Sequence, residues 1–140
     1  MAEYLKGTEV QDARAYSPAV ITEGGRTVWL AGQIATVDGE GRDIQGNFEA
    51  QTRRVFALMD QTLKRTGGAL ADLVTMTVFI KESRYGDRFV VIRRELFPDG
   101  NFPASALITV ANFARPGVEM EIQAVAVVGD TRSGGSRSAR

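Results

Sequence analysis

The stretch VEMEIQAVAVV (residues 118–128) decides the fold. Successive side chains of a β-strand point to opposite faces, so its even positions form one wholly apolar side, which indicates a strand with one face in a core. The other side carries Glu119, Glu121 and Gln123, followed by Val125 and Val127. A face that is polar at its start and apolar at its end suits neither water nor a core, so it indicates a third kind of environment.

Three other segments have the apolar and β-branched composition of strands. They are TVWLAGQI (residues 27–34), LVTMTVFI (residues 73–80) and SALITVANF (residues 105–113). SPAVIT (residues 17–22) precedes the first of them across the turn signal Gly24-Gly25. Because a glycine pair between two such runs is typical of a hairpin, the chain is predicted to open with a β-hairpin.

Two helices are predicted between the strands. Asn47 is a suitable N-cap for a helix from Phe48 to about Arg65, whose apolar residues recur at three- and four-residue spacing. A second helix is predicted to stop at Pro98. Its apolar positions are Phe89, Ile92, Leu96 and Phe97. Each apolar stripe needs a surface to cover, so both helices are expected to pack on the sheet.

This order of elements predicts an α+β fold, with two helices on one face of a mixed β-sheet. The 140 residues suffice for one domain, which is assigned to residues 1–128. Residues 129–140, GDTRSGGSRSAR, have the composition of a flexible tail.

On the face of the sheet opposite the helices, large apolar residues are predicted to lie among small and polar ones. This face is expected to comprise Trp29, Ala31, Gln33, Thr75, Thr77, Phe79, Ser105, Leu107, Thr109, Glu121, Gln123, Val125 and Val127. Monomeric proteins rarely expose so large an apolar patch. The sheets are therefore expected to pack against one another in a homo-oligomer.

The composition argues against several kinds of site. The sequence has no cysteine and no histidine, so it lacks thiolate nucleophiles and the commonest general base and zinc ligand, and neither a metal nor a cofactor is expected. Seventeen basic and seventeen acidic residues give zero net charge, which argues against binding to nucleic acid. No signal peptide or membrane span is recognisable, so a cytoplasmic protein is expected.

Glu121 is the candidate catalytic residue. At the edge of an interface between sheets, a carboxylate can be half-buried in a cleft between subunits, where it can accept a proton or orient a water molecule. The alternative is a rim glutamate that pairs with an arginine, which is the more usual role for a glutamate on a strand.

Five blocks of the sequence resemble the reactive-intermediate deaminases, which are also called Rid or YjgF-like proteins. The blocks are LAGQIA (residues 30–35), the helix around Gln51, GGALADLVTMTVFIKE (residues 67–82), FPAS (residues 102–105) and VEMEIQAVAV (residues 118–127). Their order and spacing resemble the family over residues 17–128. The resemblance implies a chorismate-mutase-like fold in a homotrimer, with ligand clefts between subunits. It also implies hydrolysis of enamines or imines to a carbonyl compound and ammonia without a cofactor.

The resemblance extends to individual site residues. Glu121 matches the glutamate that positions water in the family, and Gly32 matches a backbone group that lines the pocket. Ser105 stands where the family's Phe-Pro-Ala-Arg motif has an arginine for the substrate carboxylate. Around the same cleft, a tyrosine is replaced by Ala19, a serine by Ala31, an asparagine by Val90 and a cysteine by Leu107. These differences imply a wider, more apolar pocket and a substrate other than 2-aminoacrylate.

Three points stay open at the level of the sequence. Arg93, Arg94 or Arg115 is an alternative cation for the cleft, although each is expected at the surface. The chain is either an enzyme or a non-catalytic trimer that binds a small metabolite. A third interpretation, a ribonuclease or translation inhibitor, is opposed by the zero net charge, the lack of histidine and the loss of the cleft arginine.

Overall fold

The structure is a computed structural model, and it describes residues 2–129. In chain order the strands and helices are β1 (Ala2–Tyr4), α1 (Glu9–Ala13), β2 (Val20–Thr22), β3 (Arg26–Gln33), α2 (Phe48–Lys64), β4 (Leu73–Ile80), α3 (Gly86–Leu96), β5 (Ala104–Thr109) and β6 (Met120–Val128). Short 3-10 turns, η1 (Leu70–Asp72) and η2 (Ser83–Tyr85), precede β4 and α3. No helix within residues 2–129 is long and apolar enough to cross a membrane.

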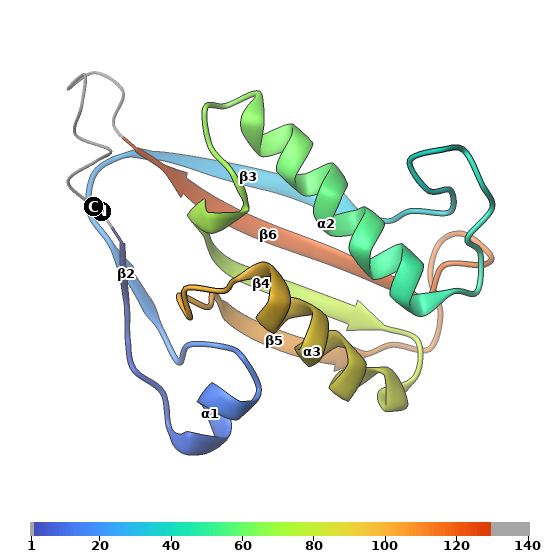
Figure 1. Cartoon of the computed structure of the whole chain (residues 1–140), viewed down its shortest axis with the longest axis horizontal. Helices are drawn as coiled ribbons and strands as arrows, with labels where there is room; N and C mark the ends of the chain where they lie inside the picture. Colours follow the sequence, from blue (N-terminus) through green and yellow to red (C-terminus); the bar gives the residue numbers. More distant parts are fainter. Residues whose placement is uncertain (1, 130–140) are drawn as a thin grey trace.

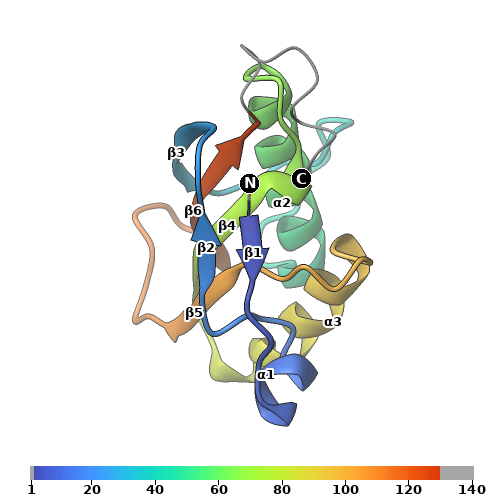
Figure 2. The ribbon, with the colours of Figure 1, turned by 90° about the vertical axis from the view of Figure 1, so that its left-hand side faces the viewer.

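The larger sheet has the strand order β3-β6-β4-β5. Strand β6 is antiparallel to both of its neighbours, whereas β4 and β5 are parallel, so the predicted mixed sheet is confirmed. Helices α2 and α3 lie next to each other on one face of this sheet (Figure 1). Seen from the side, the molecule has a helix layer and a sheet layer (Figure 2).

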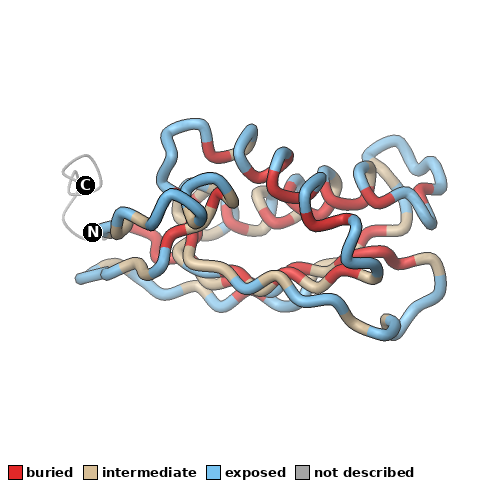
Figure 3. Tube along the Cα trace, turned by 90° about the horizontal axis from the view of Figure 1, so that it is seen from below, coloured by how far each residue is buried: buried red, intermediate tan, exposed pale blue. Residues whose placement is uncertain are grey.

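The core lies between these two layers, where the buried residues are concentrated (Figure 3). The apolar side of the deciding stretch faces α2 and α3, as predicted from its alternation. Its residues Val118, Met120, Ile122, Ala124, Ala126 and Val128 are at most 2% exposed. Helix α2 begins after Asn47, whose side chain accepts a hydrogen bond from the backbone N–H of Ala50, and it buries the predicted stripe. Burial of each large apolar side chain contributes roughly 1.5–3 kcal/mol to the free energy of unfolding.

The predicted N-terminal hairpin is wrong. Strand β2 pairs with β1, and β3 pairs with β6. Gly24 and Gly25 do make a turn with positive φ, but that turn leads the chain from the small sheet into the large one. The physical reason is length, since the eight residues of β3 find a partner in the nine residues of β6, whereas β2 has only three residues.

Two N-terminal elements were not predicted from the sequence, β1 and α1. Helix α1 follows Thr8, whose side chain accepts from the backbone N–H of Gln11 while the Gln11 side chain accepts from the backbone N–H of Thr8. Strand β1 is tied to the large sheet by the Tyr4 hydroxyl, which donates to the backbone oxygen of Leu73.

Strand β3 contains one extra residue relative to β6. Leu30 pairs with Ala124 and Gln33 pairs with Ile122, so three steps along β3 correspond to two along β6. This bulge places Gln33 opposite Ile122, on the face that the helices cover. The prediction that Gln33 lies on the opposite face is therefore wrong, because one bulge inverts the alternation beyond it.

The face assignment of β5 is also wrong. In the parallel pairing with β4, Ser105 lies beside Met76 and Leu107 beside Val78, and both of these partners belong to the core. Ser105, Leu107 and Thr109 therefore point to the helix side. Their alternating neighbours Ala104, Ala106 and Ile108 occupy the opposite face instead. Alternation alone gives the wrong face here, because the side that faces the helices carries two hydroxyl residues, whereas the outer side, Ala104, Ala106 and Ile108, is wholly apolar.

The outer face of the sheet, as we call the side away from α2 and α3, is apolar despite these corrections. Trp29 is 79% exposed on β3 and Ile108 is 42% exposed on β5. Phe79 and Val125 lie half-buried between them. The prediction of a flexible tail at residues 129–140 lies outside the described residues, except for Gly129.

Candidate functional site

Glu121 lies on the outer face of the sheet, in the middle of a layer of strands. It pairs with Phe79 of β4 on one side and approaches Gly32 in the bulge of β3 on the other. A Cβ atom on Gly32 would lie 2.2 Å from Glu121 Oε2, so only glycine leaves room for the carboxylate in this position. The bulge and the missing side chain together let the Glu121 carboxylate lie against the backbone of β3.

The Glu121 carboxylate is half-buried, and within residues 2–129 neither a hydrogen bond nor an ion pair engages it. The alternative role as a rim glutamate paired with an arginine is therefore not observed in this part of the chain. Glu121 is the strand partner of Phe79, and its carboxylate lies beside the backbone of Gly32, which follows the exposed residue Ala31. A carboxylate with all of its acceptor capacity unused can hold a water molecule or take up a proton.

A second group of predicted residues lines a cavity between α3 and β5. The cavity has a volume of about 280 Å³. Its lining residues are Arg14, Tyr16, Val90, Arg93, Ser105 and Leu107. Three of these, Val90, Ser105 and Leu107, were candidate site residues from the sequence, and the structure brings them together.

Arg93 is the main correction to the site. It was expected at the surface, yet it is only 1% exposed. Its Nη1 donates to Ser105 Oγ at 2.7 Å, and its Nη2 donates to the backbone oxygen of Arg14 at 3.1 Å. The guanidinium thus reaches Ser105, which the sequence resemblance aligns with the arginine of the Phe-Pro-Ala-Arg motif. Arg94 and Arg115 are exposed, as expected.

The helical spacing of the sequence indicates that position 93 is buried, although an arginine is usually exposed. Phe89, Ile92, Leu96 and Phe97 are separated by three-, four- and one-residue steps, and position 93 completes this stripe at i+4 from Phe89. Helical periodicity therefore places Arg93 on the face that packs on the sheet. Its guanidinium carbon lies 4.9 Å from the centre of the Phe89 ring, a cation–π contact.

The two groups of site residues do not meet within one chain. Glu121 and Gly32 lie on the outer face, whereas Ser105 and Leu107 lie on the helix side of the edge strand β5. Strand β4 lies between β6 and β5, which separates their axes by roughly 10 Å. Ala19 is half-buried ahead of β2, and its backbone oxygen accepts from the N–H of Leu5. Two residues before it, Ser17 forms a parallel bridge with Ala104 at the start of β5.

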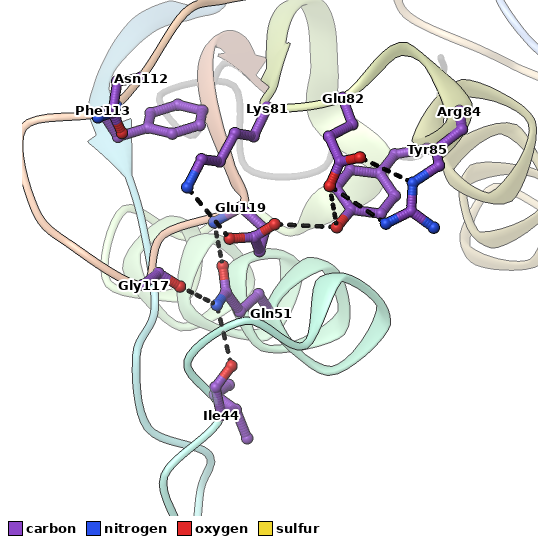
Figure 4. Close-up of polar contacts among 10 residues, drawn as sticks. All are labelled: Ile44, Gln51, Lys81, Glu82, Arg84, Tyr85, Asn112, Phe113, Gly117 and Glu119. Carbon is purple, nitrogen blue, oxygen red and sulfur yellow. Dashed lines mark hydrogen bonds and ion pairs between the residues drawn. The ribbon is translucent and has the colours of Figure 1, made fainter.

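Glu119, the other glutamate at the start of the deciding stretch, has a different environment. It is 7% exposed and lies just before β6. The Tyr85 hydroxyl donates to Glu119 Oε1 at 2.9 Å, and Lys81 Nζ lies 3.9 Å from Oε2 (Figure 4). The backbone N–H of Glu119 donates to Gln51 Oε1. Gln51 also donates to the backbone oxygens of Ile44 and Gly117, so this cluster joins α2 to the start of β6 (Figure 4).

The Tyr85 hydroxyl is expected to stabilise this junction in a pH-dependent way. Burial, the Glu119 carboxylate and, to a smaller extent, the Glu82 carboxylate, which lies 3.2 Å from the Tyr85 hydroxyl, raise the pKa of Tyr85 to about 12. The folded state therefore keeps a proton that the unfolded chain loses near pH 10, so this contribution is complete below pH 10 and disappears as the pH rises through 12. Tyr85→Phe should lower the free energy of unfolding at pH 8 by about 1.5–3 kcal/mol, the cost of a lost hydrogen bond to a charged group.

Urea unfolding at pH 8, 10 and 11.5 measures this effect, with Tyr16→Phe as the control because no hydrogen bond of the Tyr16 hydroxyl is found within residues 2–129. The difference between wild type and Tyr85→Phe should shrink above pH 10. A difference that stays constant up to pH 11.5 would show that the carboxylates of Glu119 and Glu82 do not hold the Tyr85 proton.

Acidic side chains do not cluster into a metal site in the described part of the chain, where no group of three potential ligands was found. Among the residues that the sequence named as site candidates, the charged groups in these two places are the carboxylate of Glu121 on the outer face and the guanidinium of Arg93 at the cavity. The first suits chemistry with water, and the second suits binding of an anion.

Comparison with known proteins adds a family and a fold. The family model described as endoribonuclease L-PSP matches residues 7–128. A RutC family protein of Pyrococcus abyssi is 28% identical over 79% of this chain and 84% of its own length. A protein of Dermatophagoides farinae named 2-iminobutanoate/2-iminopropanoate deaminase is 26% identical over 81% of this chain and 85% of its own length. The crystal structure of YyfB from Yersinia pestis, described as a protein of unknown function of the conserved Rid family, shares the fold with a TM-score of 0.80 at 22% identity, covering 91% of this chain and 98% of that one.

Proposed function

Because the chain belongs to the endoribonuclease L-PSP family, also called the Rid or YjgF-like family, we propose that it hydrolyses a reactive enamine or imine to a carbonyl compound and ammonia. The observation that carries this proposal is Glu121, a half-buried carboxylate that no cation or donor engages within residues 2–129. The relative from Dermatophagoides farinae, whose name states an imine deaminase, supports the same reaction class.

The active unit is a homotrimer with a cleft between subunits. Within one chain, Glu121 and the cavity at β5 lie on opposite sides of the sheet and are separated by β4. A second copy packed on the outer face would cover Trp29 and bring the edge strand of one chain to the Glu121 of another. The trimer itself is taken from the family resemblance.

The proposed chemistry needs only water and one carboxylate. An enamine first tautomerises to the imine, which leaves an electrophilic carbon. Glu121 orients a water molecule and accepts its proton as the oxygen attacks that carbon. The imine nitrogen takes up one proton from solvent, which gives a neutral amino alcohol. Glu121 then returns its proton to that nitrogen, ammonia leaves, and the hydroxyl group releases a proton to solvent, so one imine and one water give one carbonyl compound and one ammonia. The backbone at Gly32 borders the same space.

The substrate is proposed to differ from 2-aminoacrylate. Ser105 supplies a hydroxyl at the strand position where the family has an arginine, and Val90 and Leu107 present aliphatic surface beside it. A cavity of about 280 Å³ with these walls has room for a side chain larger than a methyl group.

A panel of imines generated in situ by an amino-acid oxidase tests the proposal. Keto-acid release is measured with and without the protein, for amino acids from alanine to those with bulky apolar side chains. We expect the acceleration over the spontaneous rate to increase with side-chain size. No acceleration for any member would contradict hydrolysis of amino-acid-derived imines.

The second candidate function is a non-catalytic trimer that binds a small metabolite. The specific observation in its favour is the replacement of polar groups in the cleft by Ala19, Ala31, Val90 and Leu107, which leaves Glu121 with few partners for catalysis. Retention of a metabolite without turnover in the same panel would favour this function.

Gly32→Ala tests the placement of the Glu121 carboxylate. The new methyl group would lie 2.2 Å from Glu121 Oε2, so the side chain must rotate away from the backbone of β3. We expect kcat for the best imine to fall roughly tenfold to a hundredfold, because small misplacements of a catalytic group cost about that much. The fold should be retained, since only the end of a flexible side chain has to move.

Circular dichroism and steady-state kinetics provide the measurements for this variant. Gly39→Ala is the matched control, because its new Cβ would meet only the Arg54 side chain at 3.3 Å. An unchanged kcat in Gly32→Ala would mean that the observed position of the carboxylate does not matter for turnover.

A further inference from the structure

The guanidinium of Arg93 is a buried cation without an anionic partner in the described part of the chain. The side chain is 1% exposed, and its two hydrogen bonds go to neutral oxygens, Ser105 Oγ and the backbone oxygen of Arg14. Its Nε is buried and has no acceptor within residues 2–129. Burial lowers the pKa of Arg93 to about 10, which still leaves it charged at neutral pH. A buried charge without a counter-ion is costly, so this position needs a reason beyond the fold.

The cavity beside Arg93 contains a second guanidinium, that of Arg14. Burial is the main cause of the lowered pKa of Arg93, and the positive charge of Arg14 is the second cause. The two guanidinium groups are therefore close enough to repel each other. Arg14 pairs with Asp87, but the Asp87 side chain is 91% exposed and such surface pairs are weak. A ligand oxygen can therefore replace Asp87 at small cost.

The remaining walls of the cavity complete an anion site. Tyr16 and Ser105 contribute hydroxyl groups, and Val90 and Leu107 contribute aliphatic surface. None of the six lining residues is acidic. Arg93 therefore has no counter-ion, and Arg14 has only the exposed Asp87. A ligand that replaces Asp87 needs two negative charges to neutralise both guanidinium groups, which one singly charged group would not do.

We propose that this cavity binds a small organic dianion, whose charged oxygens lie on Arg93 and Arg14 and whose aliphatic part lies on Val90 and Leu107. The identification of the bound molecule as a substrate rests on the proposed function. The binding itself does not, since it requires no hydrolysis. Arg93 reaches the cavity from helix α3, so the cation comes from a different element than the strand position now occupied by Ser105. The dianion is either a dicarboxylate or a phosphoryl compound, since both present the same charge to the two guanidinium groups.

Binding of three probes to the wild-type protein tests the proposal without any turnover. The probes are succinate, inorganic phosphate at pH 8, and butyrate, which has the carbon count of succinate but one charge. Calorimetric titrations run at one ionic strength, set with sodium chloride. We expect succinate or phosphate to bind at least tenfold more tightly than butyrate. The stronger of the two dianions identifies the dicarboxylate or the phosphoryl source.

Three variants assign the binding to the cavity. Arg93→Met should abolish binding of the preferred dianion, and Arg14→Met should reduce its affinity to that of butyrate. Arg93→Lys keeps the positive charge but lacks the planar guanidinium, so it should bind the dianion at least tenfold more weakly than the wild type does. Because it keeps a charged side chain at this position, it also serves as a second variant if Arg93→Met fails to fold. Arg53→Met, at an exposed site on α2, is the matched control and should bind as the wild type does.

Two results would overturn the inference. Equal affinities for butyrate and the dianions would show that the ligand does not need a second negative charge. A dianion affinity that survives Arg93→Met would show that the dianion does not bind at this cavity. A wild-type protein that binds none of the three probes would also overturn it. These outcomes are independent of the imine panel, because a protein that binds succinate without hydrolysing any imine fails only the proposed function.

Discussion

Glu121→Gln is expected to reduce kcat for imine hydrolysis by at least a hundredfold while leaving the fold intact. The amide keeps the size of the side chain but can neither accept the proton of the attacking water nor stabilise the charge that develops on it. Proton transfer to a positioned side chain typically contributes a factor of about 10² to 10⁴. Stability should change little, because no hydrogen bond or ion pair of Glu121 within residues 2–129 is lost.

Keto-acid release by wild type and Glu121→Gln, with urea unfolding of both, measures this prediction. Glu40→Gln serves as the control, since it removes one negative charge from an exposed loop. If Glu121→Gln keeps more than a tenth of the wild-type kcat while Glu40→Gln is unaffected, another group must activate the water. The reaction class would then stand without this residue.

Trp29→Glu is expected to dissociate the oligomer and to abolish activity with it. Trp29 is 79% exposed on the outer face of a single chain, and large aromatic residues at the centre of an interface often contribute 2 kcal/mol or more to binding. A glutamate at the same position would have to lose its water in the apolar interface, which adds a further penalty. Both effects act in every copy of a symmetric assembly.

Analytical ultracentrifugation at micromolar concentration measures this outcome. The wild type should have three times the mass of one 15.2 kDa chain, and the variant should have the mass of one chain. Val91→Glu is the matched control, because Val91 is an exposed apolar residue on α3, at 58% exposure, away from the outer face. A wild-type protein that sediments as a single chain would remove the intersubunit cleft from the proposal.

Elements with a clear side-chain period were predicted from the sequence. The pairing of the strands was not. Helix α2 was placed within one residue, because Asn47 marks its start and its apolar stripe is continuous. Strand pairing depends on contacts between distant residues, so the short run before Gly24 gave no sign that it pairs with β1. The parallel register of β5 was hidden for the same reason, and Ser105 was assigned to the wrong face.

The candidate site was predicted in part for similar reasons. Glu121 was proposed because one side of its strand is polar at its start and apolar at its end, and because it matches the water-positioning glutamate of the resembling family. Arg93 was named as an alternative cation, but its burial was not predicted because an arginine is usually exposed, although its position completes the buried stripe of α3. The closeness of Arg14 could not be foreseen, since α1 has only five residues and its placement follows from β1 and β2.

The extra residue in β3 changes which residue numbers face the helices. Upstream of Leu30, every second side chain faces the helices, and downstream of the bulge the opposite set does so. A deletion of one residue between Leu30 and Gln33 would remove the bulge and leave Gln33 opposite Ile122 on the helix side, whereas a deletion elsewhere in β3 would shift the pairing of the residues around it. When β3 is aligned with a relative that lacks the extra residue, the gap therefore belongs inside the bulge and nowhere else along the strand.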